Sequence, residues 1–165
     1  MRILATTFLA ALLLAPATAA APGSSVDASL IRQINAVRSA NGLRPLALSS
    51  RLTLAAQQHT REMGVDGYFE HTSYDKSPFW KRIEKWYPSS GWNSWEVGEN
   101  ILYQSPDLTV NEIVRAWMAS PEHRANLLSR DWHEIGISAM HFGAAPGEFS
   151  GKPVTLVTAD FGARR

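Results

Sequence analysis

The stretch Ile135–Gly162, "IGISAMHFGAAPGEFSGKPVTLVTADFG", decides the fold class of this chain. It contains two runs, 135–142 and 153–162, with the length and composition of β-strands. The Gly/Pro-rich loop "GAAPGEFSGK" between them predicts an antiparallel hairpin. The helical patterns all come earlier in the chain. The sequence therefore predicts an α+β fold rather than alternating βαβ units.

Two helices are predicted upstream of this hairpin, over 27–40 and 50–64. Apolar residues recur at helical spacing in both ranges. Asp27 or Ser29 is expected to cap the first helix, because short polar side chains satisfy the free N–H groups at a helix start. Gly64 is expected to end the second helix, since glycine adopts the left-handed conformation that terminates helices.

Two further helices have clear start signals. Thr109 and Glu112 form a capping box, in which each side chain bonds the backbone of the other. Ser120-Pro121 combines a cap residue with a proline at the first helical position, which is typical of a new helix. Between these helices and the earlier pair, "VGENILY" (97–103) is predicted as a short strand or turn.

The segment 74–96, "YDKSPFWKRIEKWYPSSGWNSWE", is rich in aromatic and polar residues. A helical turn is expected over 79–85. Long segments with little regular pattern usually bind something or cover something. Its aromatic rings suit an amphipathic or sugar-like ligand, and they suit equally a lid packed on the core.

The N-terminus has the layout of a secretory signal peptide over residues 1–19. A basic start precedes an apolar run, 3–14, and a small-residue cleavage pattern ends at Ala19. A membrane anchor is the alternative, but the run falls well short of the ~20 residues that a spanning helix needs. We therefore expect a secreted or periplasmic protein without a stable membrane span, with a flexible leader (20–26) and one domain (27–165).

Composition excludes several classes of function. Removing residues 1–19 from the 165 leaves 146, the size of one domain, with 15 basic and 15 acidic residues. The net charge is therefore zero, and the protein lacks the excess of basic residues that is typical of nucleic-acid-binding proteins. The chain has no cysteine, which excludes disulfides and thiol chemistry, so a packed core must stabilise the fold. Nothing in the composition indicates an oligomeric state.

Three polar residues near breaks in regular structure could share a site: His71, Glu99 and His123. Common catalytic and nucleotide-binding motifs are missing from the sequence. Two imidazoles and a carboxylate can hold zinc or another divalent cation, or can act together as acid and base. The alternative is that the histidines bond loop backbone while Glu99 satisfies a buried turn.

The other histidines are weaker candidates. His59 lies within the apolar stripe of the helix 50–64, so we expect it to be buried with a hydrogen-bond partner rather than to be a ligand. His133 lies in a turn beside Trp132. His141 alternates with apolar residues at the end of a strand.

Seven fragments, taken in order, resemble one family. They are "INAVRSANGLRPL", "LTLAAQQHTREM", "YFEHTS", "VGENI", "VRAWMASPEHRANLL", "HEIGISA" and "TADFG". This set is similar to the CAP superfamily (SCP, or cysteine-rich secretory protein, antigen 5 and pathogenesis-related 1), in particular its short bacterial members. The resemblance covers nearly all of the domain.

The resemblance implies a three-layer α-β-α sandwich with a central, mainly antiparallel sheet. It also implies a cleft in which His71, Glu99 and His123 meet. In longer members a second acid stands three positions after the tryptophan that matches Trp117, and this chain has Ser120 there. Glu122 is nearby but offset, so these two residues are additional cleft candidates only.

Two functions follow from these residues and the resemblance. The first is an exported binding module that holds a divalent metal and a lipid, sterol, cell-envelope or host ligand. The second is a metal-assisted, peptidase-like hydrolase in which Glu99 is the base on a water held by His71 and His123. Because fold does not confer function, the sequence leaves open whether the protein is an enzyme.

Overall fold

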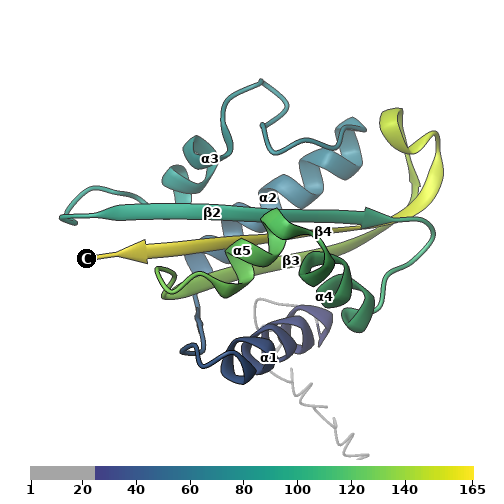
Figure 1. Ribbon diagram of the computed structural model, residues 1–165. Helices are drawn as coiled ribbons and strands as arrows, with labels where there is room; N and C mark the ends of the chain where they lie inside the picture. The colour runs from purple at the N-terminus through teal and green to yellow at the C-terminus, as the bar shows by residue number, and fades with distance from the viewer. Residues whose placement is uncertain (1–24) are drawn as a thin grey trace, which may run out of the picture.

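The computed structural model describes residues 25–165 (Figure 1). The predicted signal peptide and residues 20–24 of the predicted leader lie outside the described residues. The helices are α1 (Ser25–Ala40), α2 (Ser50–Asp66), α3 (Phe79–Trp86), α4 (Val110–Ala119), α5 (Pro121–Leu128) and the short 3-10 helix η1 (Gly147–Phe149). The strands are β1 (Ala47–Leu48), β2 (Trp95–Gln104), β3 (Glu134–Ala145) and β4 (Lys152–Arg164).

The strands form one sheet in the order β1-β3-β4-β2. The predicted hairpin is confirmed, since β3 and β4 pair antiparallel and η1 lies in their connection. The segment 97–103, predicted as a short strand or turn, belongs to a ten-residue strand, β2, which pairs antiparallel with the other edge of β4. Only β1 is parallel to its neighbour. The sheet is thus mainly antiparallel, and β2 is an edge strand.

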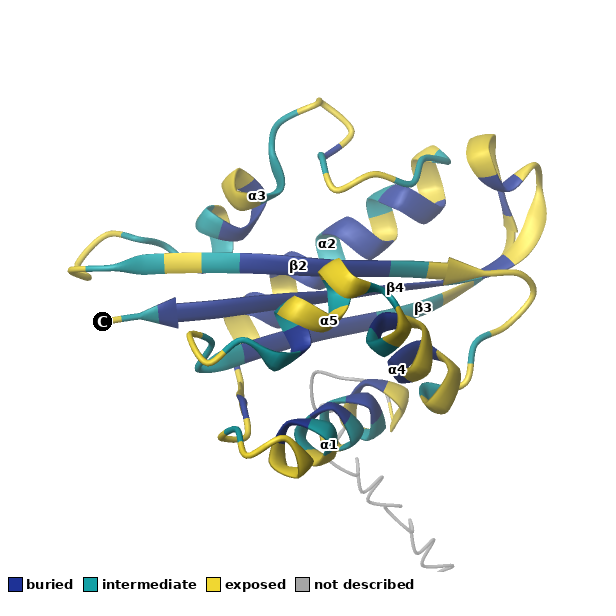
Figure 2. Cartoon of the chain, viewed as in Figure 1, coloured by how far each residue is buried: buried dark blue, intermediate teal, exposed yellow. Residues whose placement is uncertain are grey.

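The helices cover both faces of this sheet. Helices α2 and α3 lie on one face, and α1, α4 and α5 lie on the other (Figure 1). Figure 2 shows that β4 is buried along most of its length, as expected of a strand with a neighbour on each edge and helices on each face. The predicted α+β, three-layer α-β-α sandwich is confirmed.

The first helix begins earlier than the sequence predicted. Because α1 starts at Ser25, neither Asp27 nor Ser29 is its N-cap, and that prediction is wrong. Asp27 is instead buried inside the first turn, where its carboxylate accepts a hydrogen bond from the backbone N–H of Ala139 at 2.9 Å. This contact joins α1 to β3.

The second helix ends later than predicted. It continues through Gly64 to Asp66, and Gly67 ends it with φ of 71°. Gly64 lies inside the helix, and the position needs a glycine because the ring of Phe142 fills the space where a side chain would be. From the sequence alone a glycine inside a helix resembles a helix terminator, but here it allows close packing against Phe142.

The other helix signals are confirmed. Both hydrogen bonds of the Thr109–Glu112 capping box are present at the start of α4. Pro121 begins α5 directly after Ser120. The segment 74–96 contains α3, one residue longer than the expected turn at 79–85.

Candidate functional site

The site is centred on Glu99, in the middle of the edge strand β2. The sheet register places Glu99 opposite Asp160 of β4. Its side chain is only 1% exposed, although it is ionisable. Burying a carboxylate is costly unless it is paired and hydrogen-bonded, so its neighbours decide what it does.

Two partners hold the carboxylate of Glu99. Nδ1 of His71, in the loop after α2, lies 2.7 Å from Oε1. Nη2 of Arg82, on α3, donates to Oε2. Because the carboxylate is the acceptor, Nδ1 of His71 carries the proton, and Nε2 is left for a ligand. Arg82 also bonds Ser73 Oγ at 3.2 Å and so ties this loop to α3.

These contacts keep Glu99 ionised. Burial by itself would raise the pKa of Glu99, but the hydrogen bond from His71 and the charge of Arg82 outweigh burial and hold that pKa below its usual value. With both oxygens occupied, Glu99 orients the imidazole of His71. This is how a carboxylate supports a catalytic or metal-binding histidine.

His59 forms the back of the group. It is fully buried on α2, and its Nε2 lies 3.0 Å from the carbonyl oxygen of Glu70. The prediction of a buried histidine with a partner is confirmed. Burial lowers the pKa of His59 to about 4, against the opposing charge of Glu99, so His59 is neutral near pH 7. Its Nε2 is 3.9 Å from Glu99 Oε2.

Asp160 completes the buried group from β4. It is 0% exposed, and neither of its carboxyl oxygens has a hydrogen-bond partner of normal geometry within residues 25–165. Burial raises the pKa of Asp160 well above its usual value, and the negative charge of Glu99 adds to the effect. The two adjacent carboxyl groups are thus shifted in opposite directions, with the pKa of Glu99 lowered and that of Asp160 raised.

His123 approaches the same strand from the opposite helix layer. The side chain of Asn100, next to Glu99, donates to the carbonyl oxygen of His123 at 3.0 Å. Asn126, on the next turn of α5, donates to the carbonyl oxygen of Glu99 at 3.1 Å. Burial and the charge of His71 lower the pKa of His123. The backbone of His123 thus lies beside β2, but His123 is not among the residues that line the cleft with His71.

A cleft of about 350 Å³ opens at this edge. It is lined by residues from both helix layers and from β2: His71, Phe79, Val97, Gly98, Glu99, Asn126 and Trp132. The imidazole of His71 is half exposed, while Glu99 beneath it is buried. The cleft can offer a ligand one imidazole nitrogen, an amide and several apolar surfaces.

The two additional cleft candidates lie apart from this group. Ser120 joins α4 to α5, and Glu122 is exposed in the first turn of α5. Within the described part of the chain, neither forms a hydrogen bond or ion pair with His71 or Glu99. Glu122 acts only through its charge, which raises the pKa of His123 against the effect of burial.

The donor set limits how a metal could bind. No group of three or more His, Asp or Glu side chains in residues 25–165 is arranged to hold a metal ion. Glu99 already binds the cationic Arg82, which takes the place that a metal would need at that carboxylate. The residues fit a divalent ion only through the imidazoles of His71 and His123, with Glu99 as the group that orients His71.

Sequence reasoning missed Arg82 and Asp160. A signal was available for each. Arg82 shares a helix face with Phe79, Ile83 and Trp86, so a charge stands where apolar spacing predicts burial. Asp160 stands in an apolar strand, at the alternate position to buried Ala159 and Phe161. A charged residue at a core position indicates a buried partner.

Comparison with known proteins gives the family. The model of the cysteine-rich secretory protein family, CAP, matches residues 31–156. The chain is 31% identical over 129 residues to the uncharacterized protein YkwD of Bacillus subtilis strain 168. This match covers 77% of the chain and 48% of that relative, so the chain spans about half of its length.

Solved structures share the fold. An outer surface protein of Borrelia burgdorferi is 22% identical with a TM-score of 0.68, and the match covers 84% of this chain and 92% of that one. An extracellular SCP-domain protein of Bacillus anthracis str. Ames is 24% identical with a TM-score of 0.61, over 81% and 39%. The chain therefore belongs to the cysteine-rich secretory protein (CAP) family, although it contains no cysteine.

Proposed function

We propose that this CAP domain is an exported binding module whose cleft takes a ligand at His71. The supporting observation is the pair of His71 and Glu99, 2.7 Å apart, with the imidazole half exposed and the carboxylate buried. A buried carboxylate fixes the tautomer and the direction of the ring, so Nε2 is presented to the cleft. Such preorganisation is useful for binding because it lowers the entropy lost when the ligand is held.

A divalent cation, zinc above all, is the first ligand of this proposal. His71 and His123 would supply two neutral imidazoles, the form that metals bind. The lowered pKa of His123 favours that form. A metal there would supply a positive centre for an anionic or polar group of a second ligand.

That second ligand would be amphipathic, such as a lipid, sterol, cell-envelope or host component. Phe79, Val97 and Trp132 make part of the cleft wall apolar, and His71 and Asn126 add polar groups. Small-molecule sites commonly combine an apolar lining with a few polar groups that fix orientation. Export is supported by the predicted signal peptide. In residues 25–165 no helix is long and apolar enough to cross a membrane.

The test is zinc titration by calorimetry on the mature chain, purified without metal affinity. His71→Ala and His123→Ala should each weaken zinc binding by at least about tenfold, and Glu99→Gln by about 10- to 100-fold, since it orients a ligand. His141→Ala is the matched control, because this histidine bonds Thr155 and Asp107 away from the cleft. Zinc binding unchanged in both His71→Ala and His123→Ala would reject the metal part of the proposal.

A hydrolase is the second candidate, with a changed assignment. Glu99 is poorly suited as the base, because taking up a proton would break its ion pair with Arg82. His71 is the better base, oriented by Glu99 as a histidine is in a catalytic dyad. Peptide, ester and cell-wall substrates test this directly. Turnover that survives His71→Ala but is lost in Glu99→Gln would restore Glu99 as the base.

A further inference from the structure

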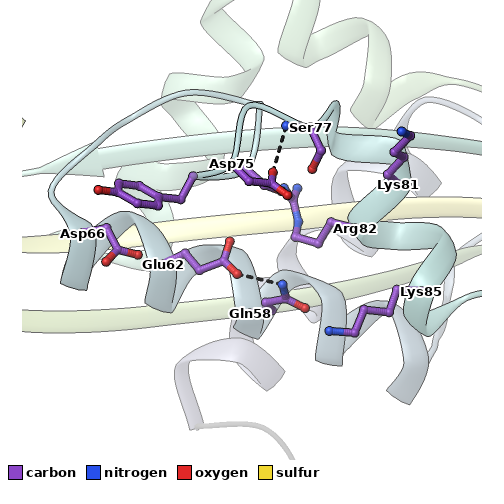
Figure 3. A pocket seen from close by; sticks show the side chains of 10 residues that line it. Gln58, Glu62, Asp66, Asp75, Ser77, Lys81, Arg82 and Lys85 are labelled. Atoms are coloured by element: carbon purple, nitrogen blue, oxygen red, sulfur yellow. Dashed lines mark hydrogen bonds between the residues drawn. The ribbon is translucent and has the colours of Figure 1, made fainter.

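A second cavity, of about 550 Å³, lies between α2, the loop that follows it and α3 (Figure 3). Its volume is in the range of small-molecule sites. His71 does not line this cavity, and its lining shares no residue with the cleft at the β2 edge. Its lining is rich in charge, with six charged residues: Glu62, Asp66, Asp75, Lys81, Arg82 and Lys85.

Four of these residues stand on two walls of opposite sign, while Asp75, in the loop that joins α2 to α3, accepts a hydrogen bond from the backbone N–H of Ser77 and interacts with the charge of Lys81. Glu62 and Asp66 come from the last turns of α2, and Lys81 and Lys85 come from α3 on the other side of the cavity in Figure 3. Among residues 25–165, the ion pairs include none that joins these acids to these lysines. The two walls therefore face each other across solvent with opposite charge. Neither wall neutralises the other by direct contact.

Arg82 lies where the cavity meets the core. Its side chain is 1% exposed, and its two terminal nitrogens are bonded to Glu99 and Ser73. Its Nε, in contrast, is buried without a hydrogen-bond partner in the described part of the chain. A buried donor without an acceptor is rare, because leaving it unsatisfied costs about 1–3 kcal/mol. A carboxylate bound in this cavity is an acceptor of the right kind for a guanidinium.

We propose that this cavity binds a short peptide or amino-acid-like zwitterion, with a free ammonium group and a free carboxylate. The ammonium group would lie at Glu62 and Asp66, and the carboxylate at Lys81 and Lys85, within reach of the Arg82 side. A ligand with only one charge gains attraction from one wall and repulsion from the other. A ligand with both charges at opposite ends gains from each wall.

The rim has a group suited to the middle of such a ligand. The ring of Tyr74 lines the cavity, is 63% exposed, and packs against the ring of Tyr68 with centroids 5.8 Å apart. An exposed ring held by a second ring is a flat surface for a peptide unit or a small side chain. The site would thus recognise the ammonium group and the carboxylate at the two ends of the ligand and accept varied groups between them.

The experiment is titration of tri-alanine with free termini, followed by amide chemical shifts and by calorimetry. Three matched probes carry the N-acetyl group, the C-terminal amide, or both. Only the zwitterion should bind, with each single block weakening the affinity at least about tenfold. Lys81→Gln/Lys85→Gln and Glu62→Gln/Asp66→Asn should each cause a similar loss. Lys152→Gln, an exposed lysine outside this cavity, is the control for net charge.

The same titration separates this proposal from the one for the cleft. His71→Ala should leave tri-alanine binding unchanged, because Arg82 contacts only the backbone oxygen of His71. Raising the salt concentration should weaken binding, since Asp66, Lys81 and Lys85 are solvent-exposed. The proposal is overturned if the doubly blocked peptide binds as well as the zwitterion. It is equally overturned if tri-alanine does not bind at about 10 mM, or if the charge variants bind it like the wild type.

Discussion

The two faces of the sheet bury different chemistry. Under α1, α4 and α5 lies one continuous apolar cluster, with the fully buried Trp117 as its largest member. Under α2 and α3 there are two smaller apolar clusters. A buried polar group shares that face: His59, Arg82, Glu99 and Asp160. The same strands supply both faces, because alternate residues of β4 and β2 point to opposite sides.

The two faces differ in how burial affects the stability of the protein. Apolar burial stabilises whatever the exact partner, in proportion to the area removed from water. A buried charge stabilises only while each partner is present, and it becomes strongly destabilising when one is lost. We therefore expect the apolar face to supply most of the free energy of unfolding. The polar face is expected to hold His71 in position while contributing little net stability.

The largest effect tests the apolar face. Trp117→Ala should lower the free energy of unfolding by about 3–5 kcal/mol, because it leaves a cavity in the main cluster. Urea denaturation measures this loss. Trp80→Ala is the control, since this ring is 40% exposed and should cost far less. Equal losses in the two variants would contradict the role given to the apolar face.

The next effect tests the ion pair of the polar face. Arg82→Leu should cost about 3 kcal/mol, because it leaves the buried Glu99 without its cationic partner. The double variant Arg82→Leu/Glu99→Leu should recover most of that loss, since no buried charge is then left without a partner. Urea denaturation of all three chains gives the coupling energy. A double variant as unstable as the sum of the single changes would show that the pair is not coupled.

A smaller effect of opposite sign is expected at Asp160. The pKa of Asp160 is higher in the folded state than in the unfolded state. The carboxyl group therefore contributes stability below about pH 4. That contribution is lost as the pH rises through the folded-state pKa. Asp160→Asn removes this loss and should stabilise the protein by about 1–2 kcal/mol at pH 7. The gain should shrink on acidification to pH 3. Melting curves from pH 3 to 8 measure it, and a gain independent of pH would contradict a raised pKa of Asp160.

The smallest expected effect concerns the N-cap of α4, the helix that carries Trp117. Thr109→Ala removes the capping box that starts the helix carrying Trp117, and should cost about 1 kcal/mol. Because the cap is at the surface, the cost should not depend on the polar group. Combining Thr109→Ala with Asp160→Asn should give additive changes in urea denaturation. Strong coupling would mean that the two faces are not independent.

The fold was largely predictable because its signals are local. The hairpin, the capping box at Thr109 and the Ser120-Pro121 helix start depend on residues close together in the chain, and all three are confirmed. The errors are local as well. Asp27 looks like a cap but bonds β3, and Gly64 looks like a terminator but packs on Phe142. In both cases a contact distant in sequence overrides the local preference.

The candidate site was predictable only in part. His71, Glu99 and His123 were singled out from their residue types and positions, and the resemblance implied that they meet. The structure pairs His71 with Glu99 and places the backbone of His123 beside the same strand. Their neighbours Arg82 and Asp160 were missed: the apolar pattern around each indicates burial, but it does not say which distant side chain each one meets. The metal that the histidines were expected to hold stays a prediction.

The sequence by itself determined the kinds of element, their order and the absence of cysteine chemistry, because backbone preference and apolar spacing act over a few residues. The tertiary structure decided which polar groups meet. It placed Glu99 between His71 and Arg82, opposite Asp160, because the sheet register and the packing of the helices bring together side chains from four segments. Only that packing removes water from the carboxylate, and only there do burial and neighbouring charge set its protonation.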